Sequence, residues 1–120
     1  MYERLFDLLK NAYHPNDYIG YSAIVLTNDD HAFTGVSIKN PVFRDCITAE
    51  QAALSKAIVK GYKKEDMKAI FIMVNKVNFK YFNYINNEFI TELMNEDKKI
   101  TLINIVGEEK ILQVKDLNYY

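Results

Sequence analysis

An unbroken apolar run, Ala69-Ile70-Phe71-Ile72-Met73-Val74, constrains the fold more than any other feature of this 120-residue chain. The run has the length of a β-strand, and it lacks the polar alternation of a strand that faces water on one side. It therefore predicts a central strand whose two faces are both covered.

The segments before this run predict both helices and strands. Apolar residues at helical spacing predict an amphipathic helix over about residues 2–13. Residues 21–26 and 32–38 flank the polar cluster Asn28-Asp29-Asp30 and predict a β-hairpin. Thr48, with Gln51 three residues later, has the spacing of a capping box and predicts a helix that ends at Gly61.

The segments after the run continue the alternation, with a helix near 84–94 and strands near 99–106 and 110–114. Gly107-Glu108 supplies the turn between the last two strands. The order α-β-β-α-β-α-β-β predicts one α/β domain over residues 1–120. We expect a three-layer α-β-α sandwich around a mixed five-stranded sheet.

Composition excludes several classes of protein. A hydrophobic content of 49% argues against a disordered chain, and a net charge of −1 provides no basic surface for nucleic acid. No apolar run approaches the ~18 residues of a membrane span, and the first residues lack a secretory signal pattern. Cys46 is the only cysteine, so no internal disulfide can form, and we expect a cytoplasmic protein without nucleic-acid or membrane partners.

Two neighbouring segments carry a recognisable motif. The run Phe33-Thr34-Gly35-Val36-Ser37-Ile38-Lys39-Asn40 is followed by Ile47-Thr48-Ala49-Glu50-Gln51-Ala52-Ala53. Together they resemble the core of the nucleoside-type cytidine deaminases, in which the two runs read roughly TGVNVEN and CAERTA. The resemblance extends to Asn11-Ala12-Tyr13-His14-Pro15, to Ser22–Leu26 and to the apolar run. It implies the cytidine deaminase-like fold.

In that family a zinc ion is the cofactor, the Cys of the second run is one of its ligands, and the Glu is the proton shuttle. Glu50 matches the shuttle, but Thr48 stands at the ligand position. The two further cysteine ligands of the family fall on Asn83 and Asn86 when the following helices are aligned.

Too few zinc donors remain to replace these ligands. A catalytic zinc needs three thiolate, imidazole or carboxylate ligands, and the thiol and imidazole inventory consists of Cys46, His14 and His31. We expect both histidines to be solvated and Cys46 to be a small buried side chain. The resemblance therefore implies a degenerate member of the family that holds no cofactor.

The four site positions also have plain structural interpretations. Thr48 has the character of a helix N-cap, and Glu50 would be favoured in the first turn by the helix dipole whatever its chemistry. We expect Asn83 and Asn86 to be a helix cap and a surface amide, with remnants of a metal loop as the alternative.

The positions that bind substrate in the family have changed as well. The resemblance places Ser37 and Lys39 where the family binds the ribose, and Ile19 where it stacks a phenylalanine on the base. A lysine ammonium has only donors, so it cannot accept hydrogen bonds from sugar hydroxyls.

We therefore expect a cytidine deaminase-like protein without zinc or deaminase activity. It would act as an interaction or structural subunit, or as a non-catalytic binder of a small ligand. The alternative is an atypical nucleoside deaminase with a rearranged metal site. The resemblance, the alanine-rich segment 49–57 and the nine tyrosines favour a homodimer or homotetramer.

Overall fold

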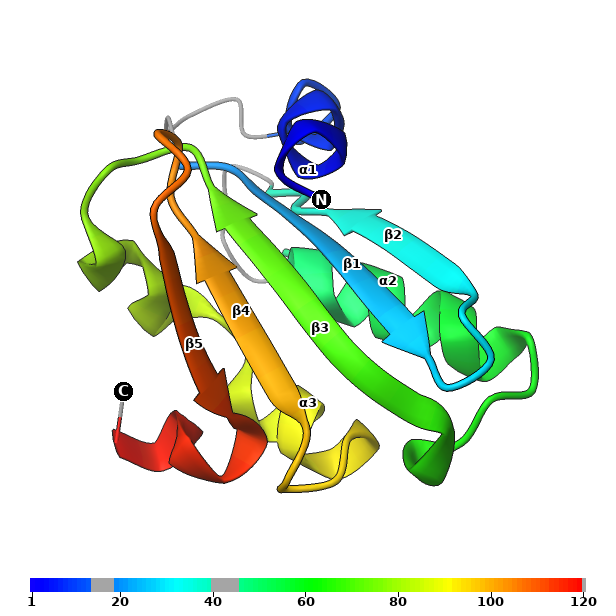
Figure 1. The fold of residues 1–120 in the computed structure, drawn as a ribbon. Helices are drawn as coiled ribbons and strands as arrows, with labels where there is room; N and C mark the ends of the chain where they lie inside the picture. Colours follow the sequence, from blue (N-terminus) through cyan, green and yellow to red (C-terminus); the bar gives the residue numbers. More distant parts are fainter. Residues whose placement is uncertain (14–18, 40–45, 120) are drawn as a thin grey trace.

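The computed structural model describes residues 1–13, 19–39 and 46–119, and its centre is a mixed five-stranded sheet (Figure 1). The strand order is β2-β1-β3-β4-β5. Only the β3–β4 pair is parallel among these neighbours. The strands are β1 (Tyr21–Thr27), β2 (Ala32–Val36), β3 (Met67–Val74), β4 (Lys99–Ile103) and β5 (Glu109–Gln113).

Helices cover both faces of this sheet, which confirms the predicted layered α/β fold. Helix α1 (Tyr2–Leu9) lies on one face, and α2 (Ala49–Val59) and α3 (Asn87–Leu93) lie on the other (Figure 1). The described residues also form three short 3₁₀ segments: η1 (Lys64–Asp66), η2 (Phe79–Tyr84) and η3 (Val114–Tyr119). None of the helices in the described part of the chain has both the length and the apolar character that crossing a membrane requires.

The apolar run forms the central strand, as predicted. Ile70 and Ile72 of β3 belong to the large core on the α2 and α3 side, whereas Met73 packs with Leu5 of α1 and Ile24 of β1. All five side chains are fully buried. Strand β3 thus separates two cores, which is the physical reason that its sequence has no polar face.

Helix α2 packs unusually close to β2 at Gly35. A Cβ atom added there would lie 2.6 Å from the backbone nitrogen of Ala53 and 2.8 Å from Cβ of Ala52. Ala49, Ala53 and Ala57 are fully buried along the same helix. The glycine and the alanines together set the distance between α2 and the sheet, and therefore the position of the residues at the start of α2.

Several predicted boundaries were wrong. Helix α1 ends at Leu9 and does not reach residue 13. The helix predicted over 84–94 is divided, because Ile85 is extended and Asn86 caps a new helix by accepting the Phe89 N–H at 3.0 Å. Strand β4 ends at Ile103, since the side chain of Asn104 accepts the Glu108 N–H at 2.8 Å and closes the turn early.

Candidate functional site

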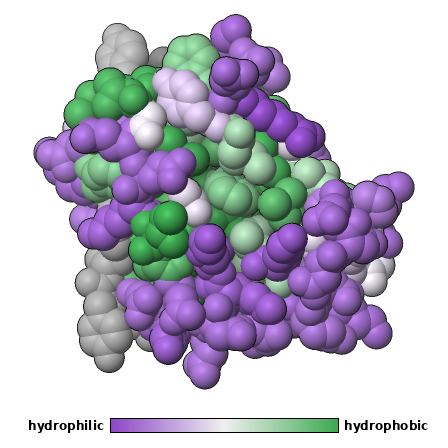
Figure 2. Space-filling model, viewed as in Figure 1, coloured by the Kyte–Doolittle hydropathy of each residue, from purple (hydrophilic) through white to green (hydrophobic). Residues whose placement is uncertain are grey.

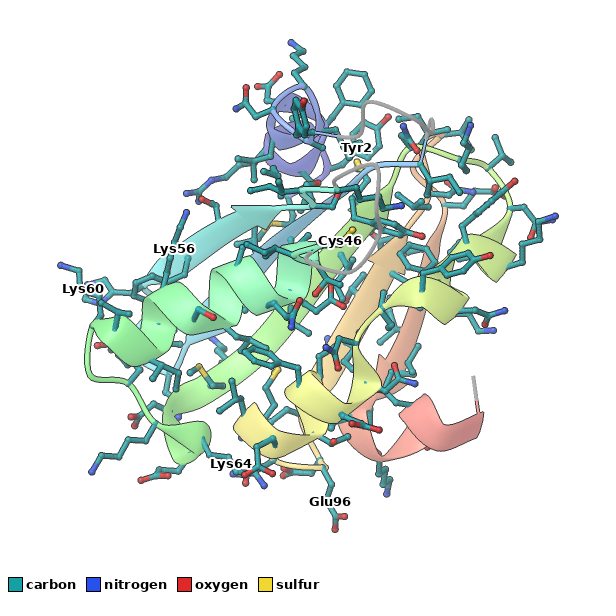
Figure 3. All side chains as sticks on the ribbon, turned by 180° about the vertical axis from the view of Figure 1, so that it is seen from behind. Tyr2, Cys46, Lys56, Lys60, Lys64 and Glu96 are labelled. Atoms are coloured by element: carbon teal, nitrogen blue, oxygen red, sulfur yellow. The ribbon has the colours of Figure 1, made fainter. Side chains whose placement is uncertain are left out.

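The start of α2, the segment after β2 and the end of η2 enclose a small cavity of about 40 Å³. The structure brings together four of the predicted site residues here: Ser37, Lys39, Thr48 and Glu50. Cys46 also lines this cavity, directly before α2 (Figure 3). Cys46 is half-buried, whereas we expected a small buried side chain. Tyr21, Ile47, Tyr84 and Ile85 complete the lining.

Thr48 forms the N-cap of α2, as the capping-box spacing predicted. Its Oγ1 accepts the Gln51 N–H at 3.3 Å, and Gln51 Oε1 accepts the Thr48 N–H at 2.9 Å. The Thr48 hydroxyl also donates to Gln51 Oε1 at 3.1 Å. The Thr48 hydroxyl, at the position of a zinc ligand in the family, is therefore already hydrogen-bonded to the backbone and side chain of Gln51.

Glu50 lies one residue into α2 and is 1% exposed. Its carboxyl accepts the backbone N–H of Asn86, so it connects the first turn of α2 to the start of α3. Burial raises the pKa of Glu50 above its ordinary value, although bonds to the N–H groups of Asn86 and Glu50 and to Thr48 act in the opposite direction.

The two asparagines have the expected kinds of role, a helix cap and an exposed amide, but in the reverse order. The side chain of Asn86 caps α3, and Asn83 is exposed on η2 and absent from the cavity lining. Across residues 1–13, 19–39 and 46–119, no three His, Cys, Asp or Glu side chains gather closely enough to hold a metal ion. His14 lies outside the described residues.

The predicted substrate positions are engaged with β1. Ser37 Oγ accepts the Tyr21 N–H at 2.9 Å, and Lys39 Nζ lies 5.6 Å from the centroid of the Tyr21 ring. Ile19 packs against the large core and does not line the cavity. Nothing in the sequence indicated that Tyr21 belongs to the site. Its hydroxyl donates to the Tyr81 carbonyl in η2, 60 positions later in the chain, and a strand pattern does not reveal a contact of that kind.

A second, larger cavity of about 600 Å³ lies at the opposite end of α2, beside the β1–β2 turn. There the Tyr62 hydroxyl donates to Asp29 Oδ2 at 2.8 Å, and His31 Nδ1 contacts the same hydroxyl. Hydrogen bonds from Thr27 and Tyr62 lower the pKa of Asp29. His31 is exposed, as predicted, but its ring is tied to Tyr62, which the sequence did not indicate.

Comparison with known proteins identifies the fold. No protein-family model matches the chain. A cytidine deaminase from Burkholderia pseudomallei is 23% identical, with a TM-score of 0.79, over 98% of this chain and 95% of that one. Cytidine deaminases from Mycobacterium leprae and Mycobacterium tuberculosis are each 16% identical over 98% of this chain, with TM-scores of 0.72 and 0.71. The matches cover 92% and 89% of those two chains.

The likeness extends over nearly the whole of this chain and of each of these enzymes. The chain has the cytidine deaminase fold.

Proposed function

We propose that this protein has the cytidine deaminase fold but does not hold a catalytic zinc and does not deaminate cytidine, and that it acts as an interaction or structural subunit. The observation that carries the proposal is the capping box of Thr48. The Thr48 side chain, which matches a zinc ligand of the family, caps the N-terminus of α2.

The donor set around this position does not fit zinc. Structural and catalytic zinc sites use thiolate, imidazole or carboxylate donors, whereas the three matching positions offer one hydroxyl and two amides. Asn86 Oδ1 already accepts the Phe89 N–H, and Asn83 is exposed away from the cavity lining. Glu50 keeps the residue type of the family's proton shuttle, but its carboxyl already accepts the Asn86 N–H at the start of α3.

The cavity also favours an interaction role over the binding of a nucleoside. Small-molecule sites typically enclose about 300–1,000 Å³, far more than the cavity of about 40 Å³ between the described lining residues. Ser37 Oγ is already bonded to β1, and Lys39 lies over an aromatic ring. Both side chains are thus held against β1, and only their remaining donor hydrogens face the cavity.

An exposed apolar surface supports self-association into a homodimer or homotetramer. Figure 2 shows an apolar patch on the sheet face that α1 covers only in part, surrounded by hydrophilic residues. Leu26 and Phe71 are half-buried on this face, and Ile111 of β5 is 58% exposed. Patches of this kind commonly mark protein interfaces. The cytoplasmic location stays a prediction from the cysteine content.

Metal content and activity test the proposal together. Protein purified without chelator and freed of its tag should contain no stoichiometric zinc by elemental analysis, and it should release no ammonia from cytidine or deoxycytidine. The matched comparison carries Thr48→Cys, Asn83→Cys and Asn86→Cys, which restores thiol donors at the three positions and should hold more zinc than the unmodified protein.

About one tightly held zinc per chain in the unmodified protein would contradict the proposal. Ammonia release that scales with protein and disappears in Glu50→Gln would establish the alternative, an atypical deaminase. Thermal stabilisation by cytidine or uridine without turnover would instead assign the role of a non-catalytic ligand binder.

A further inference from the structure

One edge of the sheet is open and uncharged. The Ser37 N–H donates to the Tyr21 carbonyl at 3.0 Å, and the Thr27 N–H donates to the His31 carbonyl at 2.9 Å. In an antiparallel ladder, bonded and non-bonded pairs alternate. Continuing that alternation along the register of β1 and β2 leaves the N–H and C=O groups of residues 32, 34 and 36 pointing away from β1.

No described strand pairs with this outer side of β2, which is the last strand of the sheet (Figure 1). The nearest contact on this outer side comes directly after β2, where Ile38 and Ile47 exchange two backbone hydrogen bonds of 2.9 and 2.8 Å. Proteins usually protect edge strands with charged residues, prolines or bulges. The opposite edge strand, β5, begins with exposed Glu109 and Lys110, but Ala32-Phe33-Thr34-Gly35-Val36 contains neither a charge nor a proline.

An apolar groove of about 340 Å³ runs beside this edge. Phe33 of β2 forms one wall, and the C-terminal half of α2 forms the other with Ser55, Lys56, Val59 and Lys60. Val59 is 85% exposed. A side chain on a strand added next to β2 would point into this groove on the α2 face, since residues alternate between the two faces of a sheet.

Two cationic side chains flank the groove. Lys56 and Lys60 are exposed and project from the C-terminal half of α2 (Figure 3). No ion pair with another described residue involves Lys56 or Lys60, so neither groove lysine is neutralised by a described residue. The groove is therefore apolar at its base and positive at its rim.

We propose that β2 is a docking site for an extended acidic peptide segment of a partner protein, which adds to the sheet as a sixth strand. Its backbone bonds to the outward groups of residues 32, 34 and 36. An apolar side chain packs between Phe33 and Val59, and acidic side chains two residues before and after it pair with Lys56 and Lys60. This mode of recognition is strand addition, in which backbone bonds give affinity and alternate side chains give specificity.

The inference gives a partner class to the interaction role proposed above, and in that sense it rests on the proposed function. Its test is nevertheless separate, because zinc content and peptide binding are measured independently. A protein that binds zinc could still bind the peptide, and a zinc-free protein could fail to do so.

The probe is a fluorescein-labelled peptide whose groove-facing residues are Glu, Val and Glu, with threonines between them. Fluorescence anisotropy should show saturable binding, and the same peptide with lysine in place of glutamate should bind at least about tenfold more weakly. The double variant Lys56→Glu, Lys60→Glu should lose about tenfold in affinity, since two exposed ion pairs are each worth up to about 1 kcal/mol. The charge-matched control Lys64→Glu, Lys115→Glu alters exposed lysines beside a different cavity and should bind normally.

Thr34→Pro tests the backbone component. The Thr34 N–H points away from β1, so proline removes an outward donor without removing a ladder bond. Binding should weaken by about tenfold or more. Hydrogen exchange on the unmodified protein should show that the peptide protects the Thr34 and Val36 amides, and this measurement decides the matter if the proline variant does not fold.

Absence of saturable binding would overturn the proposal, as would binding that the lysine double variant leaves unchanged or amides that gain no protection. Self-association that Thr34→Pro abolishes would show that a second copy of this chain occupies the edge, and the partner assigned here would then be wrong.

Discussion

Glu50 gives the sharpest test of how the start of α2 is built. Glu50 is 1% exposed, its carboxyl accepts the Asn86 N–H, and burial raises its pKa above the ordinary value of 4.5. The folded protein therefore keeps a proton on Glu50 at pH values where the unfolded chain has lost it. Replacement by Gln keeps the size of the side chain and removes the titration.

The sign of the pH dependence follows from this difference in bound protons. Stability from the neutral carboxyl is fully present below about pH 4.5 and decreases as the pH rises towards the pKa of the folded state. In this interval one proton contributes a slope of about 1.4 kcal/mol per pH unit. The free energy of unfolding of the unmodified protein, relative to Glu50→Gln, should therefore decrease with rising pH and then become constant.

Urea unfolding at a series of pH values between about 5 and 8 measures this difference. Far-UV circular dichroism is the suitable signal, because the chain contains no tryptophan. Glu88→Gln is the matched control, since it makes the same chemical change at an exposed carboxylate in the first turn of α3. A Glu50→Gln difference that is constant or increases with pH would refute the assignment of a buried, protonated carboxyl.

Three further predictions concern packing, capping and assembly. Gly35→Ala should lower the free energy of unfolding by about 3 kcal/mol in urea titrations, because the new methyl group would overlap the backbone of α2; a loss below about 0.5 kcal/mol would contradict the close approach. Thr48→Ala should cost about 1 kcal/mol in the same assay, whereas Thr48→Ser should cost little, and equal losses would argue against the cap. Light scattering at tens of micromolar should report a dimer or tetramer, and a species of about 14.0 kDa would reject self-association.

The elements that could be predicted are those with local causes. The central strand follows from the continuous apolar run at 69–74, and the start of α2 follows from the spacing of Thr48 and Gln51. The hairpin follows from a polar turn in which Asp30 adopts a positive φ of 66°. Each of these signals lies within a few residues of the structure that it specifies.

The motif resemblance located the candidate site, and with it Ser37, Lys39, Thr48 and Glu50. It could not show how those side chains are used, because their partners come from other elements. The division of the predicted 84–94 helix illustrates this limit. The Asn86 N–H bonds to Glu50, a residue 36 positions earlier, while its side chain caps α3.

The sequence by itself therefore determined the types and order of the main elements and the family that they resemble, because periodicity, caps and turns act over short distances. Only the tertiary structure decided that Tyr21 engages Ser37 and Lys39, that the cavity beside Glu50 is small, and that β2 is an open edge beside Lys56 and Lys60. These features depend on which segments meet across the sheet. Contacts of that kind join residues far apart in the chain, and no local pattern specifies them.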